Sequence, residues 1–152
     1  MDARQLLPKE HVLFEVAGSQ PREIFAVLVE PLVREGIVTD RDAFLAALEA
    51  REAEVTTQVG GGVAFPHTRS PAVTRLALVV GLTDADGVPF DPGLEERCRV
   101  FFLLAVPAAA PTAHLPLLRR LANFTRTPGK IQRLLTAKTP AAAARMITSF
   151  RG

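Results

Sequence analysis

The chain has 152 residues, of which 48% are apolar and 22% charged, a composition typical of a packed domain that excludes a disordered chain. Its single cysteine, Cys98, excludes a disulfide-stabilised scaffold and favours a reducing cytoplasm. The N-terminus lacks the basic start and apolar run of a signal peptide, and the longest apolar run, 100–106, is far shorter than the roughly 20 residues that cross a bilayer. We expect one cytoplasmic domain, residues 1–152, without membrane insertion.

The net charge of +2 conceals an uneven distribution of charge along the chain. Residues 1–96 hold all 16 acidic residues and 8 basic ones, a net −8, whereas residues 97–152 hold 10 basic residues and no acidic one. Such a segment suits an acidic partner or a nucleic acid, but it carries no recognised nucleic-acid-binding motif, so we expect no nucleic acid. Instead we expect it to face acidic residues of the first two helices or to offer a docking face for a protein. Those acidic residues include Glu30, Glu35, Asp42 and Glu49.

Two helices are predicted first along the chain. Ser19-Gln20-Pro21 precedes apolar residues at helical spacing that end at Gly36, the order of cap, early proline and terminal glycine that helices favour. Asp40 is expected to cap a second helix that runs to about Glu52, with its apolar residues on one face.

Strand patterns follow. Glycines 60–62 predict a turn into a short strand, 76–82 and 100–106 are continuous apolar runs typical of buried strands, and a turn is expected at 84–87. The Ala/Pro-rich segment 105–114 is interpreted as a loop. Helical spacing returns from Leu115, again after Pro128, and finally after the expected cap Thr139. These patterns predict an α/β fold: a single-domain sandwich with a central mixed β-sheet flanked by α-helices.

Several kinds of site are excluded by spacing. Gly60-Gly61-Gly62 is not followed by the Lys-Ser/Thr of a P-loop, and it precedes a strand rather than a helix, so a nucleotide site is not predicted. The histidines and Cys98 lack zinc-ligand spacing, and no G-x-S-x-G motif is present. We therefore expect no metal.

The three histidines differ in their surroundings. His67 follows Pro66 at the end of a predicted short strand, where α/β folds usually build their sites, and its imidazole has one free lone pair near neutral pH. Its local sequence is equally compatible with a structural role. His114 stands either in an exposed loop or at a helix start, whose free N–H groups favour phosphate. His11 has no supporting context, so we expect it on the surface.

The segment REAEVTTQVGGGVAFPHTR, residues 51–69, closely resembles the signature of the enzyme IIA domains of the bacterial phosphotransferase system, in the fructose/mannitol and nitrogen-regulatory class. The resemblance continues through DGVPF, VFFLLAVP and HLPLLRRLA and covers most of the chain. It implies a mixed sheet flanked by helices. It also implies that His67 is the phosphoryl acceptor, through Nε2, with His114 as a second active-site histidine and Arg51 as a phosphate clamp. Residues implied to shape the phosphate pocket are Thr57, Gly60, Gly62 and Arg69.

The resemblance implies a protein-histidine phosphotransferase that takes its phosphoryl group from a histidine-phosphorylated carrier protein. The phosphotransferase implied by the resemblance needs no cofactor, because the phosphohistidine is a covalent intermediate. A nitrogen-regulatory IIA, controlling a kinase or transporter by its phosphorylation state, is favoured because no transport segment is attached. The alternative is a sugar-transport IIA that passes phosphate to a fructose/mannitol-type IIB. A nucleic-acid-binding protein that uses the basic segment is a weaker alternative.

Overall fold

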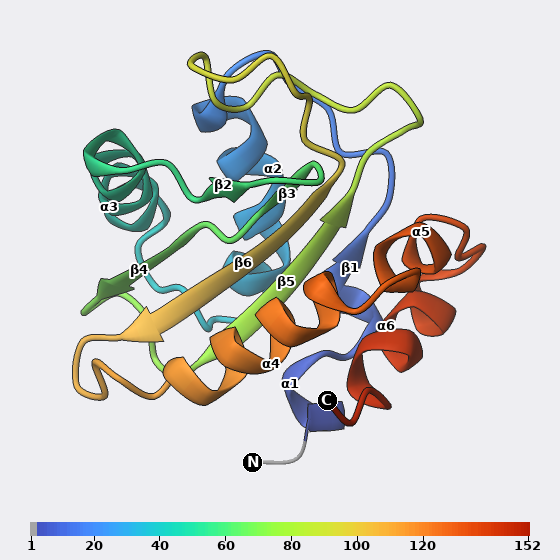
Figure 1. Ribbon diagram of the computed structural model, residues 1–152. Helices are drawn as coiled ribbons and strands as arrows, with labels where there is room; N and C mark the ends of the chain where they lie inside the picture. Colours follow the sequence, from blue (N-terminus) through green and yellow to red (C-terminus); the bar gives the residue numbers. More distant parts are fainter. Residues whose placement is uncertain (1–2) are drawn as a thin grey trace.

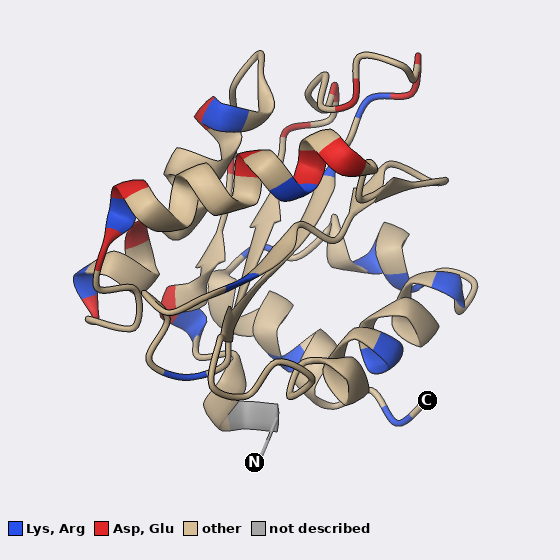
Figure 2. Cartoon of the chain, turned by 90° about the vertical axis from the view of Figure 1, so that its left-hand side faces the viewer, with Lys and Arg blue, Asp and Glu red and all other residues tan. Residues whose placement is uncertain are grey.

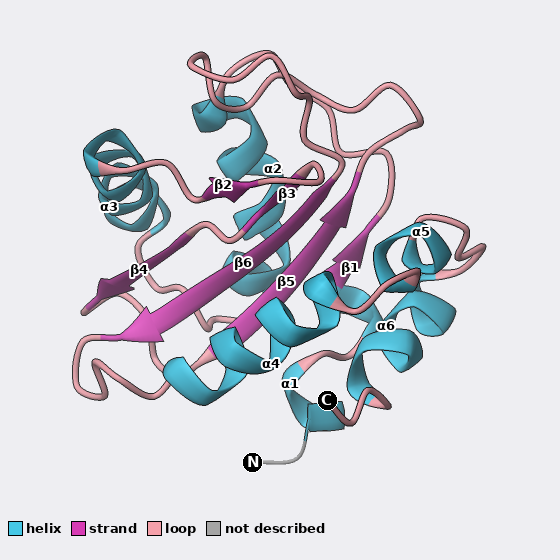
Figure 3. Cartoon of the chain, in the orientation of Figure 1, coloured by secondary structure: helices cyan, strands magenta, loops and turns pink. Residues whose placement is uncertain are grey.

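The computed structural model describes residues 3–152, with side chains described from Gln5 onward. One mixed sheet forms the centre of the molecule, with helices on both of its faces (Figures 1 and 3). The strands are β1 (Val12–Leu13), β2 (Gln58–Val59), β3 (Val63–Ala64), β4 (His67–Ser70), β5 (Ala77–Leu82) and β6 (Val100–Pro107). The helices are α1 (Ala3–Leu6), α2 (Pro21–Arg34), α3 (Arg41–Glu54), α4 (Leu115–Arg126), α5 (Lys130–Leu134) and α6 (Pro140–Thr148), with a 3-10 turn at Lys9–His11.

The sheet has the order β1-β5-β6-β3-β2, and β4 pairs with β6 beyond the end of β3. Strands β3 and β4 both run parallel to β6, whereas β5 runs antiparallel to it, with Val80 opposite Phe102. Strand β1 is parallel to β5, and β2 is antiparallel to β3. The predicted α/β fold with a mixed sheet is confirmed.

Strand β6 is buried on both faces, as its continuous apolar run predicts. Phe101 and Leu103 belong to the core beneath α2 and α3. Phe102 and Leu104, which point to the other face, belong to the core beneath α4 to α6. Two hydrophobic cores are therefore separated by the sheet, and all four of these side chains are fully buried.

Helix boundaries follow the predicted signals closely. Asp40 accepts a hydrogen bond from the Ala43 N–H at 3.1 Å and caps α3, and Thr139 caps α6 through Ala142. Helix α5 begins two residues after Pro128 because Gly129 has a left-handed φ of 84°. The expected loop 105–114 is in part strand, because residues 105–107 continue β6 alongside β4.

Two predictions about placement are wrong. His11 is not on the surface: it is 2% exposed, with Nδ1 at 3.0 Å from the Leu78 carbonyl and Nε2 at 2.9 Å from Glu35. The 3-10 turn carries the ring between β5 and α2, which the local sequence does not reveal. His67 does not end a strand but opens β4, because the chain leaves β3 at Ala64 and rejoins the sheet beside β6.

The sheet also separates the charges. Acidic residues gather on α2, α3 and the loop before β6, whereas the helices α4 to α6 carry basic residues only (Figure 2). The described ion pairs join Glu30 to Arg41, Glu49 to Arg22 and Glu35 to His11. In the part of the chain that the structure describes, no ion pair involves a residue after Glu96. The expectation that the basic segment faces these acidic residues is therefore wrong for its helices, because α4 to α6 lie on the opposite face of the sheet from α2 and α3.

Candidate functional site

His67 is the first residue of β4 and lies opposite Leu104 of β6. The Pro66 carbonyl accepts a hydrogen bond from the Leu104 N–H at 2.9 Å, so the backbone that enters β4 is fixed to the central strand. The side chain is half-buried. This places the imidazole on a rigid element at the edge of a cavity, as a site requires.

A backbone contact fixes the orientation of the His67 ring. Its Nδ1 lies 2.7 Å from the carbonyl oxygen of Phe65, and a carbonyl can only accept, so Nδ1 carries the proton of this hydrogen bond. In the neutral ring the lone pair is then on Nε2. Nε2 is therefore the nitrogen of His67 that is equipped to act as a nucleophile.

His114 lies beside His67 at the start of α4. The two ring centroids are 5.5 Å apart, at an interplanar angle of 37°. His114 is the N-cap residue of α4 and is only 7% exposed, and its Nδ1 is buried with no hydrogen-bond partner within the described part of the chain. Burial lowers the pKa of His114 below its ordinary value of 6.5, and repulsion by His67 when that ring is protonated and by Arg69 lowers it further. His114 is therefore neutral at pH 7.

The two histidines share a cavity of about 570 Å³ between α3, β4 and the loop before α4. Arg51 and Arg69 supply its positive charges, and Glu54 is the one acidic residue that lines it. Arg51 donates from Nη1 to the Val55 carbonyl at 2.8 Å, which holds its guanidinium at the end of α3. The structure thus brings together His67, His114, Arg51 and Arg69, which are distant in the sequence. The remaining lining residues are Ala47, Ala50, Thr68, Pro111, Thr112 and Leu115.

Thr57 does not line this cavity, but it is linked to His67 through the backbone. Its N–H and hydroxyl donate to the two carboxylate oxygens of Glu52 at 2.6 and 2.7 Å, and its carbonyl accepts from the Phe65 N–H at 3.1 Å. The Phe65 carbonyl in turn holds the His67 ring. Thr57 is therefore placed to position His67 rather than to contact a phosphate. Sequence reasoning did not single out Glu52, although it stands next to Arg51 in the motif.

Gly60 and Gly62 also lie outside the cavity, in the turn between β2 and β3. Gly62 has a φ of +76°, and a Cβ added to it would lie 3.1 Å from the Arg97 carbonyl, so glycine fits this close approach. Its N–H donates to Glu96 at 3.1 Å. Gly60 is exposed, with nothing within 4 Å of an added Cβ. The turn therefore packs against the segment that enters β6 and not against the histidines.

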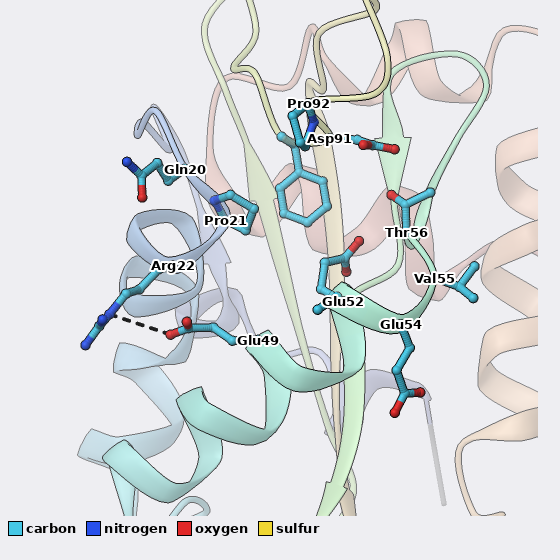
Figure 4. A pocket seen from close by; sticks show the side chains of 12 residues that line it. Gln20, Pro21, Arg22, Glu49, Glu52, Glu54, Val55, Thr56, Asp91 and Pro92 are labelled. Carbon is cyan, nitrogen blue, oxygen red and sulfur yellow. Dashed lines mark ion pairs between the residues drawn. The ribbon is translucent and has the colours of Figure 1, made fainter.

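A second cavity, of about 540 Å³, lies on the other side of the α3 C-terminus (Figure 4). The start of α2 and the end of α3 form its walls, where Arg22 and Glu49 pair at 3.6 Å, and Phe90 and Asp91 also line it. Glu54 lines both cavities. This second cavity contains neither His67 nor His114, so the candidate site is the cavity around the histidine pair.

The described residues do not form a metal site, a reactive thiolate or a membrane-spanning helix. Within residues 3–152, no group of three or more His, Cys, Asp or Glu residues is placed to hold a metal ion. Burial raises the pKa of the Cys98 thiol to about 12, so this cysteine is not a thiolate at neutral pH. None of the described helices has both the length and the apolar composition of a membrane span.

The fold is α/β with a mixed sheet, and the candidate site is a neutral histidine beside another histidine in a cavity that two arginines line. These features suit a phosphotransfer protein. The model of a known family, "Phosphoenolpyruvate-dependent sugar phosphotransferase system, EIIA 2", matches residues 5–150. The chain belongs to this family, whose members are phosphotransfer proteins. The resemblance inferred from the motif of residues 51–69 is thereby confirmed.

The chain matches relatives whose names give two different roles. It is 32% identical to the fructose-specific EIIA component of Haloferax volcanii, over 91% of this chain and 89% of that protein. It is 31% identical to the nitrogen regulatory protein of Pseudomonas aeruginosa, over 97% of this chain and 95% of that protein. The crystal structure of the nitrogen regulatory protein IIA-Ntr from Neisseria meningitidis superposes with a TM-score of 0.83 at 25% identity, covering 94% and 97% of the two chains.

Proposed function

We propose that this protein carries a phosphoryl group on Nε2 of His67, which it receives from a histidine-phosphorylated carrier protein. One observation carries the proposal: the hydrogen bond from Nδ1 to the Phe65 carbonyl leaves Nε2 as the nucleophilic nitrogen beside His114. The Nε2 lone pair forms the new N–P bond while the N–P bond of the donor breaks, and the electron pair of that bond returns to the donor imidazole. In the neutral imidazole, Nε2 carries no proton, so none has to leave it.

Three neighbouring side chains have complementary roles in this proposal. Arg51 and Arg69 balance the negative charge of the phosphoryl oxygens, and the planar guanidinium of Arg51 can bind two of them at once. His114 is neutral, so it has one N–H donor for these oxygens and adds no positive charge that would raise the cost of burial. Catalysis then rests on alignment and charge stabilisation, which are the main requirements of phosphoryl transfer.

The role that we favour is regulatory: the phosphorylation state of His67 controls the binding of a target protein. A phosphate adds a charge of about −1.5 to −2 in a cavity that the exposed residues Arg69 and Glu54 line, enough to form or break an interface. The match to the P. aeruginosa nitrogen regulatory protein over nearly the whole of both chains supports this role. The alternative role is transfer of the phosphoryl group to a sugar-specific IIB domain, and the match to the fructose-specific component supports it.

The test is incubation with a phosphorylated carrier protein, with intact-mass measurement of phosphate uptake. We expect one acid-labile phosphate on the wild type and none on His67→Ala, whereas His11→Gln, the matched histidine control, retains uptake. Absence of uptake by the folded wild type would refute the proposal. Adding a fructose-type IIB domain then separates the two roles, because rapid loss of phosphate to IIB supports transport and its retention supports regulation.

A further inference from the structure

One face of the molecule consists of helices that carry only positive charges. This basic layer comprises α4, α5, α6 and the chain end, residues 115–152, and it contains no acidic residue. Arg120 is engaged in the fold, because it donates to the carbonyls of Thr148 and Phe150. The cations of the layer that are exposed to solvent are Arg119, Arg126, Arg133, Lys138, Arg145 and Arg151.

These exposed cations are not balanced by neighbours. The described ion pairs involve only α2, Glu35, α3 and His11 of the 3-10 turn, and none of them includes a residue of the layer. In Figure 2 the ribbon of the helices in this layer has blue positions and no red ones. A face with several like charges and no counter-charge repels itself, and this repulsion is relieved when a polyanion binds.

A hollow between α6 and residues 7–9, at the edge of the layer, combines charge with apolar walls. Its volume is about 590 Å³, and Lys9 and Arg145 supply two cations. Leu7 and Ala144 provide apolar surface, and Thr148 provides a hydroxyl. Glu10 follows Lys9 in the sequence, but it does not line the hollow. A hollow lined by two cations and by apolar residues suits a phosphate group attached to a glycerol and acyl chain.

We propose that the basic layer adsorbs to an anionic phospholipid membrane, with the hollow at Lys9 and Arg145 receiving a lipid headgroup. Surface cations attract anionic lipids additively. A single-stranded nucleic acid would need exposed aromatic rings for stacking. Here Phe124 is buried, and the ring of Phe150 packs edge-on against it at 5.3 Å with Lys130 over its face. Adsorption of this kind is peripheral and requires no inserted helix.

The proposed orientation leaves the histidine cavity accessible. The cavity is lined by α3, β4 and residues 111–115, and no residue of α5 or α6 contributes to it. In Figure 1, α5 and α6 lie on the opposite side of the molecule from α3 and β4. A membrane that contacts α5 and α6 would therefore leave His67 open to a protein partner. The inference is independent of phosphate transfer, since none of the exposed cations of the layer and none of the residues that line the hollow belongs to the cavity.

The test is co-sedimentation with vesicles of 30% phosphatidylglycerol in phosphatidylcholine, compared with phosphatidylcholine alone. We expect binding to the anionic vesicles only, weakening as salt rises. Arg133→Gln/Arg145→Gln should lower the partition coefficient by about 25-fold, or about fivefold for each cation removed. The matched control, Arg34→Gln/Arg75→Gln, removes the same charge from exposed positions outside the layer and should bind nearly as wild type.

Three outcomes would overturn the proposal. The first is no binding of the wild type to anionic vesicles at low salt. The second is an equal loss in both double variants, which would show that net charge alone acts. The third is tighter retention on duplex DNA than on vesicles of equal phosphate content, which would identify a nucleic-acid surface instead. Thermal unfolding verifies that both variants fold, and phosphate uptake by His67 should be unchanged in both.

Discussion

Glu52 and Thr57 form a closed pair, in which both carboxylate oxygens of Glu52 accept hydrogen bonds from the backbone and hydroxyl of Thr57. The pair is linked to the proposed phosphoryl acceptor, because Thr57 also accepts the Phe65 N–H and Phe65 holds the His67 ring. A glutamate at the end of a helix thus fixes the orientation of an imidazole in another element, without touching the cavity that contains His67.

Thr57→Val should weaken both stability and phosphate transfer. The substitution keeps the shape of the side chain but removes a donor to a partly buried carboxylate, at a cost of about 1–3 kcal/mol in the free energy of unfolding. Urea unfolding measures this cost. The rate of phosphate uptake should fall as well, because the Phe65 carbonyl loses support. Thr112→Val, an exposed change in the cavity wall, is the control; an unchanged rate in Thr57→Val would contradict the positioning role.

His114 should make the protein less stable in acid. Its pKa in the folded state lies below 6.5, so the unfolded chain binds a proton more readily than the folded one, and stability is lost as the pH falls through the ordinary histidine range. Between about pH 7.5 and about pH 5.5, the melting temperature of the wild type should fall more than that of His114→Gln. Equal falls in the two proteins would show that His114 does not contribute to this pH dependence.

Arg51→Lys should slow phosphate uptake without unfolding the protein. Lysine keeps the charge but loses the planar pair of donors, so we expect the rate of phosphate uptake to fall by up to about tenfold. Stopped-flow or quenched transfer from the phosphorylated carrier measures the rate. Arg34→Lys, at an exposed position of α2, is the control. A wild-type rate in Arg51→Lys would exclude two-point binding of the phosphoryl group by Arg51.

His11→Leu should destabilise the protein without affecting the site. The buried ring bridges the Leu78 carbonyl and Glu35, and its loss leaves the carbonyl without this partner, at a cost of about 1–3 kcal/mol. Glu35→Gln should cost less, because Glu35 is 36% exposed and water can replace the contact. Urea unfolding compares the two variants. A smaller effect of His11→Leu than of Glu35→Gln would contradict this account.

Arg120→Met should loosen the end of α6. Arg120 donates to the carbonyls of Thr148 and Phe150 at 2.7 and 2.6 Å, where the helix leaves its last carbonyl groups without internal partners. We expect a loss of about 1–3 kcal/mol, because hydrogen bonds from a charged donor are stronger than neutral ones. Arg119→Met, an exposed neighbour with the same charge change, should leave the unfolding midpoint nearly unchanged. Equal effects would assign the loss to charge rather than to these contacts.

The sequence by itself determined the α/β class, the two capped helices and the buried central strands, because apolar periodicity and capping residues act over a few positions. Asp40 and Thr139 cap their helices as predicted, and the motif of residues 51–69 indicated the family.

Tertiary structure alone decided which residues meet. It brought His114 beside His67 and buried His11, and it kept Gly60 and Gly62 away from the cavity. It also put the basic helices α4 to α6 on the opposite face of the sheet from the acidic residues of α2 and α3. These contacts depend on how β4 and β5 align with β6, and strand pairing of that kind joins residues far apart in the chain that no local pattern records.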